Sequence, residues 1–314
     1  MTPRYLITGG AGFIGSHIAQ ALLDRGETIR ILDNLSTGYR HNVEQLTGDV
    51  EFLEGDVLDA DVVSRAMEGV EVVFHQAALA SVPRSVANPL ETNAACVTGT
   101  LTVLEHARKK GVRRVVYAAS SSAYGDQDHP CKTETDLPAP ISPYAVAKLA
   151  AEYYCQSYYT TYGFETVCLR YFNVFGPRQD PESPYSAVIP LFICAMLSGE
   201  QPVIFGDGHQ ARDFTFVSDV VQGNLLAAEA VGAAGQVINV ANNRQTSLLE
   251  LIATLNDILE MDVQPDHQPE RVGDVRHSLA DIQRAQTLLG YQSRVGLREG
   301  LQQSIDYYRT LVDR

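Results

Sequence analysis

Tyr144 and Lys148 stand four residues apart in a segment with strong helix signals. A spacing of four places two side chains on one face of a helix, one turn apart. A nearby ammonium group stabilises a phenolate and lowers the ordinary tyrosine pKa of about 10, so the pair could remove a proton from a hydroxyl group. Ser142 is expected to cap this helix, Pro143 suits its first position and Gly163 should end it.

Three hydroxyl side chains, Ser120, Ser121 and Ser122, follow an apolar segment over 115–119 that predicts a strand. Ligands of parallel sheets bind beyond the carboxyl ends of the strands. A hydroxyl at this position could orient a substrate hydroxyl toward Tyr144. Taken alone, the serine run would be interpreted as an ordinary polar loop.

A glycine-rich segment follows the first predicted strand and precedes a helix. Gly9, Gly12 and Gly15 have the spacing that allows a tight turn, a close approach of backbone to a pyrophosphate, and close packing of helix on strand. The helix N-terminus then offers unpaired N–H groups to the phosphates. The second predicted strand ends near Asp33, whose carboxylate suits two ribose hydroxyls and would repel a 2′-phosphate. The pattern predicts a dinucleotide site that prefers NAD to NADP.

Strand and helix patterns alternate through the first 170 residues. The predicted strands are 5–8, 28–32, 51–53, 72–76, 115–119 and 166–169, and helical patterns cover 14–25, 93–110 and 144–162. This alternation predicts a Rossmann-type, doubly wound parallel sheet with helices on both faces. After about residue 170, loops rich in Pro and Gly separate isolated helices, the last over 297–311. This part is expected to form a smaller, interleaved α/β domain.

The 314 residues carry 24 Lys and Arg against 38 Asp and Glu, which gives a formal charge of −14. Nucleic acids and anionic membranes are bound mainly by clustered Lys and Arg, so this balance argues against both as partners. The five cysteines lack the short spacings of metal or redox motifs and are expected to be reduced. No apolar run reaches the roughly 18 residues of a membrane span, and the N-terminus does not resemble a signal peptide. We expect a soluble, cytoplasmic protein without a bound metal.

Together these residues resemble the extended short-chain dehydrogenase/reductase family, and within it the nucleotide-sugar 4-epimerases, above all those acting on UDP-N-acetylglucosamine. The resemblance covers essentially the whole chain and rests on GGAGFIG (9–15), DNLSTG (33–38), GDV (55–57), HQAA (75–78), SSSAYG (120–125), SPYAVAK (142–148), LRYFNVFGPRQ (169–179), RDFTFVSDV (212–220) and RVGDVRHS (271–278). It implies an NAD-binding domain of residues 1–172 with about 214–242. A uridine diphosphate sugar would be bound by residues 173–213 and 243–314.

The resemblance also implies roles for single residues. The catalytic residues would be Ser120, Tyr144 and Lys148, and Ser121 could share or take the role of Ser120. The NAD cofactor would be held by Gly9, Gly12, Phe13, Ile14, Gly15, Asp33, Asn34, Ser36, Thr37, Gly38, Asp56, Val57, Gln76, Ala77, Ala78, Asn93, Tyr144, Lys148 and Tyr171. The sugar nucleotide would be held by Ala80, Ser81, Ser121, Ser122, Asn173, Gln179, Ala187, Val188, Arg212, Arg271, Asp274 and Ser278.

The implied reaction is reversible epimerisation at C4 of the sugar. Tyr144 would take the proton of the 4-hydroxyl while the C4 hydride moves to NAD, and the resulting 4-keto sugar would rotate before the hydride returns. Related dehydratases and decarboxylases have a carboxylate near the catalytic hydroxyl, which Ser121 and Ser122 do not supply. Epimerases that exclude N-acetyl groups have a tyrosine at the position of Ser278, so UDP-GlcNAc and UDP-GalNAc are the expected substrates.

Three alternatives remain at this point. The first two are a UDP-glucose/UDP-galactose epimerase and a UDP-glucuronate epimerase, which would want a basic residue near C6 of the hexose. The third is a non-catalytic regulator that senses NAD, although such proteins typically lose the Tyr or the Lys of the catalytic pair. Family members also pair the helices matching 93–110 and 144–162 into a four-helix bundle across a two-fold axis, so the resemblance implies a homodimer.

Overall fold

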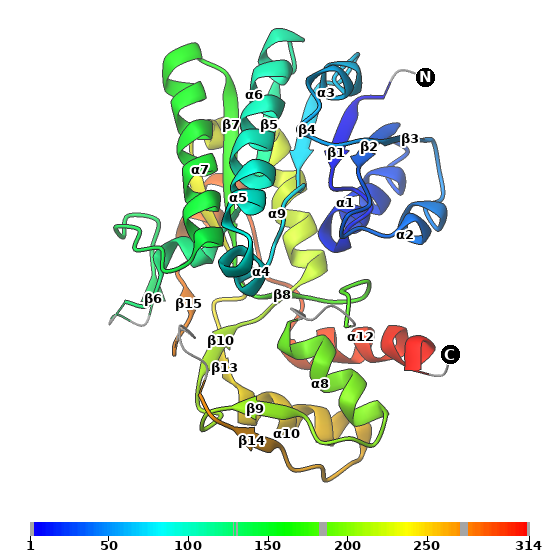
Figure 1. Cartoon of the computed structure of the whole chain (residues 1–314), viewed down its shortest axis with the longest axis vertical. Helices are drawn as coiled ribbons and strands as arrows, with labels where there is room; N and C mark the ends of the chain where they lie inside the picture. The colour runs from blue at the N-terminus through cyan, green and yellow to red at the C-terminus, as the bar shows by residue number, and fades with distance from the viewer. Residues whose placement is uncertain (1–2, 128, 130, 182–186, 271–275, 313–314) are drawn as a thin grey trace.

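Seven parallel strands form one sheet in the order β12-β7-β5-β4-β1-β2-β3 (Figure 1). The computed structural model describes residues 3–127, 129, 131–181, 187–270 and 276–312. The strands are β1 Tyr5–Thr8, β2 Ile29–Asp33, β3 Val50–Glu54, β4 Val72–His75, β5 Arg114–Ser120, β7 Glu165–Tyr171 and β12 Val237–Val240. The predicted Rossmann-type sheet is therefore confirmed. Its seventh strand, β12, belongs to the segment of about 214–242 that was expected to join the first 172 residues. The strand order reverses between β1 and β4, which is where sheets of this type bind ligands.

Helices cover both faces of the sheet and bury two apolar clusters against it. One face carries α1 Phe13–Leu23, α2 Arg40–Glu44 and α9 Val217–Glu229. The other carries α3 Ala60–Ala66, α6 Gly99–Lys109 and α7 Pro143–Tyr162, with the short helices α4 Val82–Ala87 and α5 Pro89–Asn93 next to α7. Because both faces are covered, the central strands β1 and β4 are buried at every residue, whereas the edge strand β3 is only partly buried.

Of the two helices expected over 144–162 and 93–110, the first is found as one continuous helix and the second is not. Helix α7 has the predicted ends, since Ser142 Oγ accepts the N–H of Ala145 (3.2 Å) and Gly163 takes a left-handed conformation (φ 64°). The helix expected over 93–110 is instead α5, a π-helical turn over Ala94–Thr98, and α6. Wide turns of this kind occur mostly at functional sites.

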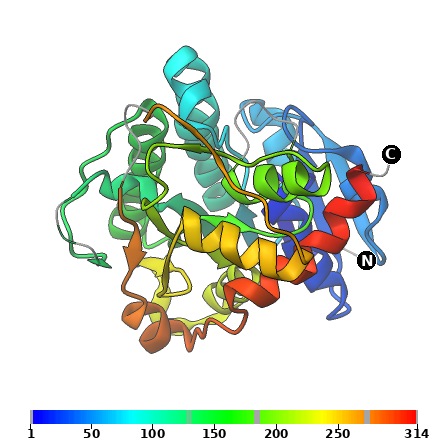
Figure 2. The same ribbon diagram turned by 90° about the horizontal axis from the view of Figure 1, so that it is seen from below.

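The C-terminal part of the chain lies beyond the carboxyl ends of the strands (Figure 1). It contains α8 Val188–Leu197, α10 Leu248–Leu259 and α12 Leu297–Val312, with the strand pairs β8 Val174–Phe175/β11 Thr215–Phe216, β9 Val203–Phe205/β14 Asp266–Gln268 and β10 Ala211–Asp213/β13 Gln245–Ser247. Strand β15 Leu279–Ala280 pairs with the earlier strand β6 Cys131–Lys132, and α11 Gln283–Leu289 packs on the sheet against β12 and α9. Seen from below, α8, α10 and α12 lie across the underside of the sheet (Figure 2). They enclose a third apolar cluster, so this part has a core of its own.

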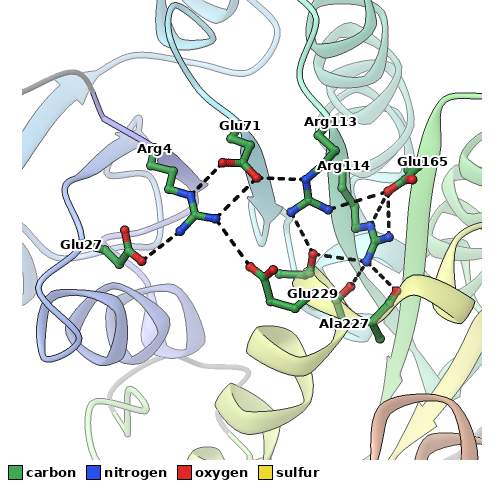
Figure 3. Close-up of polar contacts among 10 residues, drawn as sticks. Arg4, Glu27, Glu71, Arg113, Arg114, Glu165, Ala227 and Glu229 are labelled. Atoms are coloured by element: carbon green, nitrogen blue, oxygen red, sulfur yellow. Dashed lines mark hydrogen bonds and ion pairs between the residues drawn. The ribbon is translucent and has the colours of Figure 1, made fainter.

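Arginine and glutamate side chains join the opposite, amino ends of the strands (Figure 3). Arg4, just before β1, bonds Glu71, just before β4, at 2.8 Å, and Arg114 at the start of β5 pairs with Glu165 at 2.7 Å. The buried Arg114 also donates to the carbonyl of Ala227 (2.7 Å), near the end of α9. The last carbonyls of a helix lack partners and favour positive charge, so Arg114 fixes α9 to the sheet. Among the described residues, no helix combines the length and the apolar character that a membrane crossing needs.

Candidate functional site

The turn between β1 and α1 has the form that its glycine spacing predicts. The N–H of Gly12 donates to the carbonyl of Gly9 (3.1 Å), and α1 begins without a side-chain cap. Within the described residues, the N–H groups of Phe13, Ile14 and Gly15 have no acceptor. A Cβ on Gly15 would lie 2.2 Å from the Gly9 carbonyl oxygen, so glycine is required for α1 to approach β1 this closely. The resulting uncapped helix N-terminus fits a ligand that carries phosphate.

Asp33 lies beside this turn, at the end of β2. Its carboxylate accepts the N–H groups of Ala11 (2.9 Å) and Leu35 (2.8 Å). Burial raises the pKa of Asp33, and these two hydrogen bonds oppose that rise. Asn34 donates to Asp56 at 2.8 Å, so three residues expected on the adenosine side of the cofactor lie together.

The other predicted cofactor residues lie on the same edge of the sheet or on α1 and α5. Gly38 and Val57 are buried, Phe13, Ile14, Gln76, Ala77 and Ala78 are partly exposed, and Asn34, Ser36, Thr37 and Asn93 are exposed. These residues border the uncapped end of α1 from both sides of the strand-order reversal. Their arrangement fits an extended dinucleotide.

Gln76 and Tyr171 meet through Asn224, a residue of α9 that the sequence patterns did not single out. The Tyr171 hydroxyl lies 2.9 Å from Asn224 Oδ1 and 3.2 Å from Gln76 Oε1, and Gln76 Nε2 donates to Asn224 Oδ1 at 3.3 Å. Asn224 Nδ2 donates to the carbonyl of Val220 (2.8 Å), which turns its oxygen toward the other two side chains. Burial raises the pKa of Tyr171 well above its ordinary value, so its hydroxyl stays protonated and serves as a donor.

The predicted catalytic residues come from two neighbouring elements. Ser120 ends β5, whereas Tyr144 and Lys148 lie on the first turns of α7. Ser120 Oγ accepts both the hydroxyl (2.9 Å) and the N–H (3.2 Å) of Ser122 within the 3₁₀ turn that follows. These bonds leave the hydroxyl hydrogen of Ser120 available for another acceptor.

Burial controls the protonation of the Tyr144 and Lys148 side chains. It raises the pKa of Tyr144, whose side chain is partly exposed, and a hydrogen bond with Ser120 lowers it. It lowers the pKa of Lys148, which is 3% exposed and whose Nζ lies 4.5 Å from the centre of the Tyr117 ring. Burial therefore has the largest effect on the Tyr144 pKa in the chain by itself, and the lowering of that pKa by Lys148 stays a prediction.

A neutral histidine lies beneath Lys148. Burial, and to a lesser extent the charge of Lys148, lower the pKa of His75 to about 3. The two ring nitrogens of His75 lie 2.6 Å from Thr8 Oγ1 and 2.9 Å from Thr100 Oγ1. The ring is therefore held by hydrogen bonds and adds no charge next to the ammonium.

The predicted substrate residues come from several separate segments of the chain. Ala80 and Ala187 are exposed, and Ser81, Ser121, Ser122, Asn173, Gln179, Val188, Arg212 and Ser278 are partly exposed. Arg271 and Asp274 lie outside the described residues. The Ser81 hydroxyl caps α4 by accepting the N–H of Arg84 (3.1 Å), which limits its capacity to bind a ligand.

Asp213, on β10 beside Arg212, brings several of these segments together. Its Oδ2 accepts the N–H of Ala280 (3.2 Å), and its carbonyl accepts Asn173 Nδ2 (3.2 Å). The N–H of Ser278 donates to a carbonyl of β10 at 3.1 Å. Burial raises the pKa of Asp213 to about 7 against the effect of several backbone N–H groups. The segments of Asn173 and Ser278 thus both meet β10, which contains Arg212.

Two contacts that the sequence did not reveal join α1 and the Asp33 loop to the loop after Asn173. His17 Nε2 lies 2.9 Å from the carbonyl of Pro177, and burial lowers the pKa of His17 to about 4. The Tyr39 hydroxyl donates to Asp180 at 2.7 Å. The dinucleotide side and the substrate side of the site are therefore linked directly.

The chain matches known proteins over its full length. A model of the NAD dependent epimerase/dehydratase family matches residues 5–241. A UDP-N-acetylglucosamine 4-epimerase from Methanobrevibacter ruminantium, solved with UDP-N-acetylmuramic acid, is 39% identical with a TM-score of 0.94, covering 99% of this chain and 100% of that one. A UDP-glucose 4-epimerase from Thermotoga maritima, solved with UDP-glucose, is 39% identical with a TM-score of 0.93, covering 98% and 99%. A putative UDP-glucose 4-epimerase from Methanocaldococcus jannaschii is 37% identical, covering 97% and 98%.

Replacing Gly15 by alanine should weaken NAD binding by at least about tenfold. The new Cβ would meet the Gly9 carbonyl at 2.2 Å and push α1 away from β1, which displaces the N–H groups at its start. Isothermal titration of the protein, freed of bound nucleotide, with NAD measures the change. Gly296→Ala is the control, because a Cβ there meets no atom within 4 Å. Equal NAD affinity in Gly15→Ala and the parent protein would contradict this account of the turn.

Proposed function

Because the chain belongs to the NAD dependent epimerase/dehydratase family, we propose that it interconverts UDP-N-acetylglucosamine and UDP-N-acetylgalactosamine by epimerising C4. Its cofactor is NAD, and epimerisation of a UDP-sugar at C4 agrees with the names of the relatives that match it from end to end. The observation that carries the proposal is the Tyr144–Ser120 pair, placed next to the buried Lys148 and on the same sheet edge as the glycine turn.

The chain itself supplies proton transfer and orientation. Tyr144 would accept the proton of the sugar 4-hydroxyl, and Ser120, whose oxygen is already occupied by Ser122, would donate its hydrogen bond to that sugar oxygen. Bound NAD supplies a reversible hydride acceptor and a positive ring. Burial raises the Tyr144 pKa, and in the assembled site Ser120 donates to the sugar oxygen, so deprotonation of Tyr144 would depend on positive charge close to its ring.

The other predicted residues would bind the cofactor and the sugar nucleotide. Gly9 to Gly15 would hold the pyrophosphate and Asp33 the adenosine ribose, with the other predicted cofactor residues along that edge. Asn173, Arg212 and the segment of Ser278, gathered around β10, would hold the sugar nucleotide. We propose that residues 1–172 with about 214–242 act as the NAD-binding unit and the rest as the substrate-binding unit.

The preference for an N-acetylated sugar rests on small side chains. Ser278 is partly exposed and held to β10 by its backbone, so its short side chain leaves space that a tyrosine would fill. Ser122 and Ala187 are also small. The names of the relatives include both UDP-N-acetylglucosamine and UDP-glucose epimerases, so UDP-glucose/UDP-galactose is the second candidate pair.

Replacing Tyr144 by phenylalanine should reduce kcat for epimerisation by at least about 100-fold, the usual contribution of a positioned acid–base group. The ring keeps its packing, so NAD affinity and thermal stability should stay close to those of the parent protein. Conversion of UDP-GlcNAc followed by NMR measures kcat, and titration with NAD provides the control. Full activity of Tyr144→Phe would refute the assignment.

Replacing Ser278 by tyrosine should lower kcat/KM for UDP-GlcNAc at least about tenfold and lower it far less for UDP-glucose. The tyrosine ring would fill space that an acetamido group at C2 needs and a hydroxyl group does not. Both substrates are assayed in both epimerisation directions. Ser198→Tyr, at the exposed end of α8, is the control for the added aromatic ring. An unchanged ratio between the two substrates would show that Ser278 does not select the sugar.

The outer face of α7 supports a homodimer built from α6 and α7 of two copies. Tyr158 is buried, but Tyr153 and Tyr162 are 51% and 56% exposed and Val146 is 52% exposed. Covering this apolar face would favour association. Sedimentation at micromolar concentration should give twice the mass of the chain, and Tyr153→Glu should shift it toward monomer. A monomer in the parent protein would contradict the proposal.

A further inference from the structure

Asn239 is a fully buried polar residue on the edge strand β12 that no catalytic or binding role explains. Its Oδ1 accepts the hydroxyl of Tyr124 at 2.7 Å. Its Nδ2 donates to the carbonyls of Lys132 (3.1 Å) and Asp281 (3.2 Å). Its backbone N–H donates to Glu134 at 2.8 Å. One side chain of β12 therefore bonds three segments: two that precede it by more than 100 residues and one that follows it by 42 residues.

The first of these segments is the serine turn, which we define as Ser120–Tyr124. Tyr124 ends this turn and is 1% exposed. Its ring lies 4.6 Å from the Arg170 guanidinium, which Glu152 holds with two hydrogen bonds of 2.9 and 2.7 Å. The ring is thereby fixed in place, and the hydroxyl bond to Asn239 fixes the end of the turn that carries Ser122.

The second and third segments form the strand pair β6/β15, which lies beside the sheet edge (Figure 1). Ala280 pairs with Lys132, and the N–H of Asp281 donates to the carbonyl of Lys132 at 2.9 Å. Ser278 comes directly before β15. The bond from Asn239 to the Asp281 carbonyl therefore fixes the strand that presents Ser278.

The side-chain amide of Asn239 cannot be rotated by half a turn without losing its hydrogen bonds. In the observed orientation its oxygen faces a hydroxyl donor and its NH₂ group faces two carbonyls, so every strong hydrogen-bonding group has a partner. Turned over, the oxygen would face two carbonyl oxygens inside the protein, which is costly. The Asn239 side chain thus links the serine turn directly to the segment that follows β15.

Building on the proposed function, we infer that Asn239 is a positioning residue that sets the width of the sugar pocket between Ser122 and Ser278, and so the acceptance of a C2 acetamido group. On the proposed function, an acetamido group at C2 is bulkier than a hydroxyl and therefore depends more on how Ser122 and Ser278 are placed. Loosening the link should therefore raise KM for UDP-GlcNAc more than for UDP-glucose.

The test measures kcat and KM for UDP-GlcNAc and for UDP-glucose in Asn239→Leu and in Tyr124→Phe. Tyr124→Phe is the milder change, because it removes one hydroxyl and keeps the ring against Arg170. In both variants kcat/KM for UDP-GlcNAc should fall about tenfold, mainly through KM, and that for UDP-glucose by less than about threefold. Because both changes break the same bond, the double variant should show the substrate ratio of Asn239→Leu alone.

Asn256→Leu is the matched control. Asn256 also makes two side-chain hydrogen bonds, both to the backbone of Val263 at 2.9 Å. It lies on α10 and contacts neither the serine turn nor β15 through these bonds. It should leave the substrate ratio unchanged. Equal losses on both substrates in Tyr124→Phe would overturn the inference about Asn239 while leaving the proposed function intact. A parent protein that converts neither UDP-GlcNAc nor UDP-glucose would refute the proposed function, and with it the inference.

Discussion

Parallel pairing of the seven strands is the constraint on which the site depends. Parallel strands end at one common edge, so the glycine turn after β1, Asp33 after β2, Gln76 after β4, Ser120 at the end of β5 and Tyr171 at the end of β7 all reach the same side of the molecule. The ion pairs of Arg4 and Arg114 hold the opposite edge together. The predicted binding residues thereby lie at the edge where the C-terminal part of the chain is placed.

Burial then determines what the side chains at this edge can do. It keeps Tyr144 and Tyr171 protonated in the chain by itself and disfavours the charge of Lys148. Under the proposed function, the Tyr144 phenolate would therefore form only when bound ligands bring positive charge close to it. The −14 charge of the chain belongs to its surface and does not prevent binding of anionic ligands at a helix N-terminus.

The sequence predicted those features that have a local signal. Glycine spacing, the caps Ser142 and Gly163, and the apolar strands depend on neighbours within a few residues, and all of them are found in the structure. Asn224, Asp213 and Asn239 have no such signal, because each acts on segments more than 60 residues away or on several at once. The strong effect of burial on Tyr144 and Lys148 could not be predicted either, since a spacing of four shows only that two side chains share a helix face. Arg271 and Asp274 remain predictions from the resemblance.

The most direct test of the account is epimerisation of UDP-GlcNAc in deuterium oxide. A tyrosine that removes only the 4-hydroxyl proton, with the C4 hydrogen retained within the site, predicts UDP-GalNAc that carries no deuterium at C4. Proton NMR of the sugar detects both the product and its label. Formation of UDP-GalNAc with deuterium at C4, or no product at all from protein loaded with NAD, would contradict the account.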